Sequence, residues 1–160
     1  MEREKIIVSA CLLGIDCRYD GGNCLSKAVA ALIGRVALIP VCPELLGGLS
    51  TPRPPAGIAK GSGIDVIEGK SRVLTVKGED DVTSQFIKGA RESLKIAQLL
   101  GVKKAIFKEE SPSCGVHFIR RNDTRVPGSG VTTALFLNEG LDVIGEEEII
   151  GIKKTLGPSV

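Results

Sequence analysis

The sequence predicts a single α/β domain with three layers, built on a mainly parallel sheet with an inserted β-hairpin. Short apolar runs rich in β-branched residues alternate with segments of helical spacing, and the connections between most of them are short. At 160 residues the chain fits one domain, which buries roughly two thirds of its unfolded surface. We expect this Rossmann-like domain over residues 1–150 and a frayed tail over residues 151–160.

The first part of the chain predicts a β–α–β unit. Residues 5–10 and 36–41 are apolar runs of the length of a strand that is covered on both faces. Between them, Ser26 is a candidate N-cap for a helix whose apolar residues recur at helical spacing, and Gly34 is its expected end.

The rest of the chain predicts a hairpin followed by further alternation. Residues 64–67 and 72–76 read as the hairpin, because a glycine-containing loop joins two alternating runs. The longest helix is expected over residues 81–100, where apolar positions form one stripe. A strand at residues 103–107, a helix at 131–138 and a last strand at 141–144 complete the order.

Composition argues against several classes of protein. With 21 Lys and Arg against 19 Asp and Glu, the net charge of +2 is too small for the footprint of a nucleic-acid-binding protein. No apolar stretch approaches the roughly 18 residues that spanning a bilayer requires, so we expect no membrane role. The odd number of cysteines, five, and a charged start that leads straight into a strand favour the cytoplasm.

Three cysteines follow predicted strands. Cys11 comes after the first strand, Cys42 after the second, and Cys114 lies in the loop after the third. The carboxyl ends of parallel strands meet at one edge of a sheet, where ligands bind in open α/β folds. The predicted loops at residues 43–62 and 109–129 are long enough to be functional.

Thiolates at one edge favour a soft metal. A thiolate needs a base, a cation or a metal at neutral pH, and the only histidine, His117, lies three residues after Cys114. Three sulfur ligands without a complement of imidazoles favour zinc or an iron–sulfur cluster.

Four motifs carry a resemblance to a known family. The first motif is Ser9-Ala10-Cys11-Leu12-Leu13-Gly14 with Arg18-Tyr19-Asp20-Gly21, and the second is Cys42-Pro43-Glu44 with Gly47-Gly48-Leu49 and Pro52-Arg53-Pro54-Pro55. The third is Ser111-Pro112-Ser113-Cys114-Gly115, and the fourth is Gly128-Ser129-Gly130-Val131-Thr132. Together they resemble the thiouracil desulfidase family over residues 5–144. The resemblance implies a [4Fe-4S] cluster held by Cys11, Cys42 and Cys114, and expected to be lost or replaced in protein prepared in air. It further implies non-redox removal of sulfur from a small thiolated nucleobase such as 2-thiouracil.

The resemblance also implies catalytic roles for three oxygen-bearing side chains. Glu44 is expected to act as general base on a water that attacks the thiocarbonyl carbon, yielding the carbonyl product and hydrosulfide. Ser111 or Ser113 is expected to hydrogen-bond the substrate or the water. The alternative for Glu44 is a cap on the turn that follows it.

Four further residues are expected to bind substrate. Arg18 and Arg53 are candidates that either clamp the loops or favour nearby thiolates, and the residues leave both open. Backbone N–H groups near Gly128 and Gly130, at the start of a helix, are expected to hold a polar edge of the substrate. One position departs from the family pattern, since Gly57 stands where a glutamate is expected.

Two other functions remain open. Cys11, Cys42 and Cys114, with His117 as a fourth ligand, are the set for a non-catalytic zinc or sulfur-binding protein. A nucleoside-processing enzyme without a metal would leave the three cysteines unexplained. Cys17 and Cys24 are not required as ligands, and the oligomeric state is left open.

Overall fold

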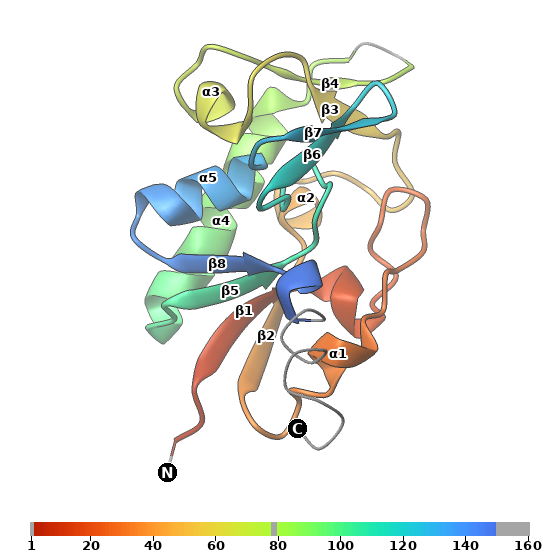
Figure 1. The fold of residues 1–160 in the computed structure, drawn as a ribbon. Coiled ribbons are helices and arrows are strands. Elements are labelled where there is room, and N and C mark those ends of the chain that lie inside the picture. Colours follow the sequence, from red (N-terminus) through yellow and green to blue (C-terminus); the bar gives the residue numbers. More distant parts are fainter. Residues whose placement is uncertain (1, 78–79, 150–160) are drawn as a thin grey trace.

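A four-stranded parallel sheet lies at the centre of the protein, as the α/β prediction requires (Figure 1). The computed structural model describes residues 2–77 and 80–149, so the tail predicted to fray lies outside the described residues. The strand order is β2-β1-β5-β8. The strands are β1 (Lys5–Ser9), β2 (Ala37–Val41), β5 (Lys104–Phe107) and β8 (Asp142–Gly145).

Helices cover both faces of this sheet. α4 (Thr83–Leu100) and α5 (Val131–Asn138) lie on one face, and the short α1 (Lys27–Ala30) lies on the other (Figure 1). Neighbouring residues of β1 point to opposite faces, so Ile7 packs with the helices α4 and α5 while Val8 packs with α1. Both side chains are fully buried. The three predicted layers are therefore confirmed.

The long helix α4 follows its predicted apolar stripe. Phe86, Ala90, Leu94 and Ala97 are buried at spacings of three and four residues. The backbone N–H of Thr83 donates to Asp81 Oδ1 at 2.9 Å, which satisfies a free donor of the first turn. No helix in the described part of the chain has the length and apolarity to cross a membrane.

The predicted hairpin is wrong at its first strand. Residues 64–67 belong to helix α3 (Gly63–Ile67), because the Asp65 carboxylate accepts from the Ser62 backbone N–H at 2.8 Å and stabilises a helix start. Its second strand exists in part, as β4 (Val73–Thr75). It pairs antiparallel with β3 (Ala56–Ile58).

A hairpin forms instead inside a segment predicted to be a loop. β6 (Phe118–Arg121) and β7 (Thr124–Pro127) pair antiparallel around Asn122 and Asp123, whose φ values are 49° and 61°. Two successive positive φ values are typical of a tight two-residue turn. The other predicted loop contains β3 and the short helix α2 (Pro43–Leu46).

A close approach of two helices positions α2 on α4. A Cβ at Gly89 of α4 would lie 1.9 Å from the carbonyl oxygen of Pro43, and a Cβ at Gly47 would lie 1.9 Å from that of Gln85. Only glycine permits this contact. Because α2 begins directly after Cys42, the contact also fixes the position of the Cys42 loop.

Gly89→Ala tests this contact. In an exposed helix interior Gly→Ala stabilises by about 1 kcal/mol, but here the added methyl overlaps Pro43. We expect the free energy of unfolding, measured in urea, to fall by about 1–3 kcal/mol. The exposed neighbour Lys88→Ala serves as the control and should change it little. A stabilised Gly89→Ala protein would contradict the close packing of α2 on α4.

Candidate active site at the carboxyl edge of the sheet

A cavity of about 580 Å³ opens at the carboxyl edge, next to the point where the strand order reverses. The chain runs from β1 to β2 on one side and then crosses to β5 on the other side of β1. Connections therefore leave the sheet in opposite directions at this point, which is where open α/β sheets bind ligands. The predicted site residues that line the cavity are Cys11, Arg18, Cys42, Glu44, Arg53, Ser111, Ser113 and Cys114.

The three cysteines come from three strand ends. Cys11 lies in a 3₁₀ turn (Ala10–Leu13) directly after β1, Cys42 follows β2 at the start of α2, and Cys114 lies in the loop after β5. All five cysteines are free thiols. Among the described residues, no three His, Cys, Asp or Glu side chains are arranged to hold a single metal ion.

Burial disfavours two of these thiolates. Burial raises the pKa of Cys11 to about 12, and the nearby Cys24 and Cys42 sulfurs add to the effect. Burial also raises the pKa of Cys114 well above its ordinary value, although hydrogen bonds from Ser9 and Ser113 oppose this. Both groups therefore stay protonated at neutral pH unless a cation compensates the negative charge.

Cys42 behaves differently because a neighbouring thiol stabilises its charge. The neighbouring Cys17 thiol lowers the pKa of Cys42, and the backbone N–H of Leu45 and the Arg53 guanidinium contribute. The same pairing raises the pKa of Cys17. Cys17 is buried and lines the cavity, so the structure brings this predicted bystander into the site.

Glu44 lies between a cation and a hydroxyl. Arg53 Nε donates to Glu44 Oε1 at 3.0 Å, and Ser113 Oγ donates to Glu44 Oε2 at 2.9 Å. The Arg53 and Glu44 side chains are only 5% and 16% exposed, so this ion pair is shielded from solvent. The Arg53 guanidinium also donates to the Cys17 carbonyl oxygen at 2.9 Å. The Arg53 backbone N–H donates to the Tyr19 carbonyl oxygen at 2.8 Å. Arg53 thus holds these loops together, and its positive charge also favours the Cys42 thiolate.

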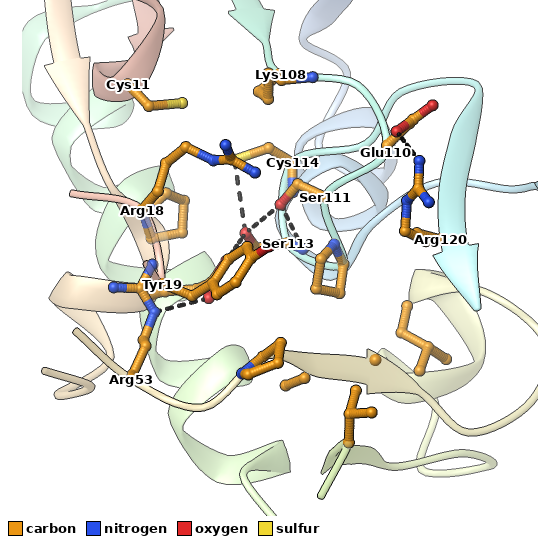
Figure 2. Close-up of a pocket in the computed structure, with 18 of the residues that line it drawn as sticks. Cys11, Arg18, Tyr19, Arg53, Lys108, Glu110, Ser111, Ser113, Cys114 and Arg120 are labelled. Carbon is orange, nitrogen blue, oxygen red and sulfur yellow. Dashed lines mark hydrogen bonds and ion pairs between the residues drawn. The ribbon is translucent and has the colours of Figure 1, made fainter. Parts of the chain in front are cut away.

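Ser111 shapes the loop that carries Cys114. Its Oγ accepts from the backbone N–H groups of Ser113 at 3.2 Å and Cys114 at 3.1 Å. The Ser111 and Ser113 hydroxyls are 3.0 Å apart, which continues the chain of hydrogen bonds that starts at Glu44 (Figure 2). Arg18 lines the cavity with its guanidinium 5.3 Å from the centroid of the Tyr19 ring.

Gly128 and Gly130 do not line the cavity, contrary to the substrate-binding expectation. The N–H groups that start α5 are occupied, since Val131 donates to the Pro112 carbonyl oxygen at 2.9 Å and Thr132 to that of Ser113 at 2.8 Å. The backbone N–H of Gly128 donates to His117 O at 2.9 Å. The backbone N–H groups of Val131 and Thr132 at the helix start therefore bind the cysteine loop.

Several residues of the site escaped the sequence analysis. Glu109 is buried, and its Oε1 accepts from the backbone N–H groups of Val116 at 2.7 Å and His117 at 3.0 Å, which anchors the loop after Cys114. Lys108 lines the cavity and pairs with Glu146 at 3.0 Å. Their position in the sequence is the one signal that points to the site, because Lys108 and Glu109 directly follow the buried end of β5.

Two remaining positions have clear environments. The exposed His117 ring lies with Nε2 2.6 Å from Glu148 Oε1 and does not line the cavity, so the zinc alternative lacks its proposed fourth ligand there. Gly57 does line the cavity, and a Cβ there would meet only the Arg120 carbonyl oxygen, at 3.8 Å. The position expected to carry a glutamate therefore has room for a Cβ atom.

Fold and site define an α/β enzyme with a cysteine-lined cavity at the carboxyl edge of its sheet. The family model for 2-thiouracil desulfurase matches residues 6–148, so the chain belongs to this family of enzymes that remove sulfur.

Two known proteins are similar over nearly their whole length. The protein "Uncharacterized protein YbbK" of Bacillus subtilis (strain 168) is 44% identical over 147 residues, which span 90% of this chain and 97% of that protein. A solved structure, the [4Fe-4S]-dependent thiouracil desulfidase TudS, is 39% identical with a TM-score of 0.79. The match covers 96% of this chain and 98% of the other. The family match over residues 6–148 includes the segments that carry Cys11, Cys42 and Cys114.

Gly130→Ala tests whether the start of α5 supports the Cys114 loop. A Cβ at Gly130 would lie 2.5 Å from the carbonyl carbon of Ser113, so the loop must shift. We expect a lower melting temperature, equivalent to about 1–3 kcal/mol, and faster alkylation of the buried Cys114 thiol. Gly57→Ala, whose Cβ would make only an ordinary van der Waals contact with the Arg120 carbonyl oxygen, is the matched control and should change neither measurement. Unchanged alkylation in Gly130→Ala would contradict the support role.

Proposed function

We propose that this enzyme is a [4Fe-4S]-dependent desulfidase acting on a small thiolated nucleobase of the 2-thiouracil type. The observation that carries the proposal is the placement of the Cys11, Cys42 and Cys114 thiols along one cavity that also contains Glu44. The family match and the likeness to TudS support it. A reducing compartment such as the cytoplasm suits the five free thiols.

The donor set fits the cluster. Cys11, Cys42 and Cys114 would hold it, and three thiolates leave one iron without a protein ligand. When bound, the cluster supplies a Lewis-acidic iron with affinity for sulfur. Because burial disfavours the Cys11 and Cys114 thiolates, bound iron would have to compensate their negative charge for these residues to act as ligands.

Glu44 is the proposed general base. Its Oε1 is held by Arg53 and its Oε2 by the Ser113 hydroxyl, so the carboxylate has a defined direction beside the cavity. It accepts a proton from a water whose oxygen adds to the thiocarbonyl carbon, and the carbon–sulfur bond then breaks. The products are the carbonyl base and hydrosulfide. One water enters and no electron is gained or lost, so the reaction is a hydrolysis.

The two serines extend the path of the proton. Ser113 lies in hydrogen-bond contact with both Glu44 and Ser111, at 2.9 and 3.0 Å. The Ser113 hydroxyl thus connects a proton on Glu44 with the Ser111 hydroxyl, and Ser111 also lines the cavity. Arg53 keeps the carboxylate oriented between turnovers, because its guanidinium is itself held by backbone carbonyl oxygens.

Single Cys→Ser substitutions test the ligand assignment. We expect Cys11→Ser, Cys42→Ser and Cys114→Ser each to lose iron and activity after anaerobic purification, because a serine hydroxyl is a poor ligand for the cluster. Iron content measured by chemical analysis is the readout. Cys24→Ser is the matched control, and it and Cys17→Ser should keep nearly the wild-type iron content. Full iron retention in Cys114→Ser would defeat the assignment.

Glu44→Gln tests the general base. The amide oxygen still accepts from Arg53, so we expect the cluster and substrate binding to persist while kcat falls roughly 10²–10⁴-fold. Glu110→Gln, a second carboxylate that lines the cavity, is the control and should retain most of its turnover. Near-normal kcat in Glu44→Gln would remove this residue from the chemistry. Loss of iron would make Glu44 a support of the Cys42 loop instead.

A further inference from the structure

One aromatic side chain faces the cavity, and the proposed reaction leaves it without a role. Tyr19 is the only tyrosine of the chain and the only aromatic residue in the cavity lining that the structure describes. Its side chain is 40% exposed, whereas Phe86, Phe107 and Phe136 are buried in the core. An exposed aromatic ring inside a binding cavity offers a flat apolar surface to a ligand.

Hydrogen bonds fix the backbone at Tyr19, and the Arg18 guanidinium lies near its ring. The Arg18 guanidinium lies 5.3 Å from the ring centroid. The turn around the ring is closed by Gly21 N–H donating to Arg18 O at 2.9 Å, and the Tyr19 carbonyl oxygen accepts from Arg53 N–H at 2.8 Å. Figure 2 shows the ring extending between Arg18, Arg53 and Ser113. Tyr19 is therefore tied to the same arginine that orients Glu44.

We propose that Tyr19 stacks on the plane of the substrate ring and so makes the enzyme selective for planar heterocyclic thiones over small non-aromatic thiocarbonyl compounds. The inference rests on the proposed function and adds the contact that recognises the base. Stacking of a nucleobase on an aromatic side chain contributes about 1–3 kcal/mol and needs no particular hydrogen-bond pattern. The contact depends on the ring of the base and not on its sulfur, so it stabilises the bound substrate and the bound product equally.

Equal stabilisation of substrate and product gives a distinct kinetic signature. A uniform contact changes KM without changing kcat. We expect Tyr19→Ala to raise KM for 2-thiouracil and the Kd for uracil in parallel, by roughly 5- to 150-fold, at unchanged kcat and iron content. The preference for 2-thiouracil over thioacetamide, measured as the ratio of kcat/KM values, should fall by the same factor.

Two further variants separate stacking from bulk and from hydrogen bonding. Tyr19→Phe keeps the ring and should bind uracil within about threefold of wild type. Tyr19→Leu keeps apolar volume without a flat face and should lose affinity as Tyr19→Ala does. Val76→Ala, which trims another exposed apolar side chain of the cavity lining, is the control and should bind uracil normally.

Calorimetric binding of uracil to the anaerobic holoenzyme decides the inference without turnover. Weaker binding by Tyr19→Ala and Tyr19→Leu, with Tyr19→Phe near wild type, upholds stacking. Wild-type affinity in Tyr19→Leu, or loss of affinity in Tyr19→Phe, overturns it. Failure of the proposed function is a separate result, because it appears in the wild-type enzyme as absence of iron or of hydrosulfide release.

Discussion

The parallel pairing of β1 with β2 on one side and β5 on the other is the constraint on which the site depends. It forces three strand ends to one edge, and each is followed by a cysteine that lines the cavity. The fully buried Ile7 and Val8 hold β1 between the two helical layers. The core of the sheet thus brings the three thiols to one edge, and contacts of the loops then fix the Cys42 and Cys114 segments there.

The loops then set the electrostatics of the cavity. Arg53 is the central cation, since it binds the Glu44 carboxylate and the Cys17 carbonyl oxygen and its charge favours the Cys42 thiolate. A shielded ion pair contributes little net stability, because desolvation offsets the attraction. It does fix the direction of the Glu44 carboxylate, which the role proposed for Glu44 as a general base requires. The Cys11 and Cys114 thiols, by contrast, have raised pKa values, because burial disfavours their thiolates.

The layered fold and the cysteine edge could be predicted because buried strands and an amphipathic helix leave clear periodic signals. Residues 64–67 were misread, since their apolar alternation was the same as that of a strand while the Asp65 contact with the Ser62 N–H selected a helix. Contacts over long sequence separations left no local signal. Ser113 meets Glu44 across 69 residues, and the start of α5 is occupied by carbonyl groups that no spacing rule places there.

The most direct test of the account is the product balance of the anaerobically purified enzyme with 2-thiouracil, in the absence of any electron donor or acceptor. Chromatography for uracil and colorimetry for sulfide give the two yields in one reaction mixture. The account predicts uracil and hydrosulfide in equal amounts over many turnovers, because the proposed reaction is a hydrolysis in which the enzyme is neither oxidised nor reduced. Absence of both products, or a strict requirement for an added redox partner, would contradict it.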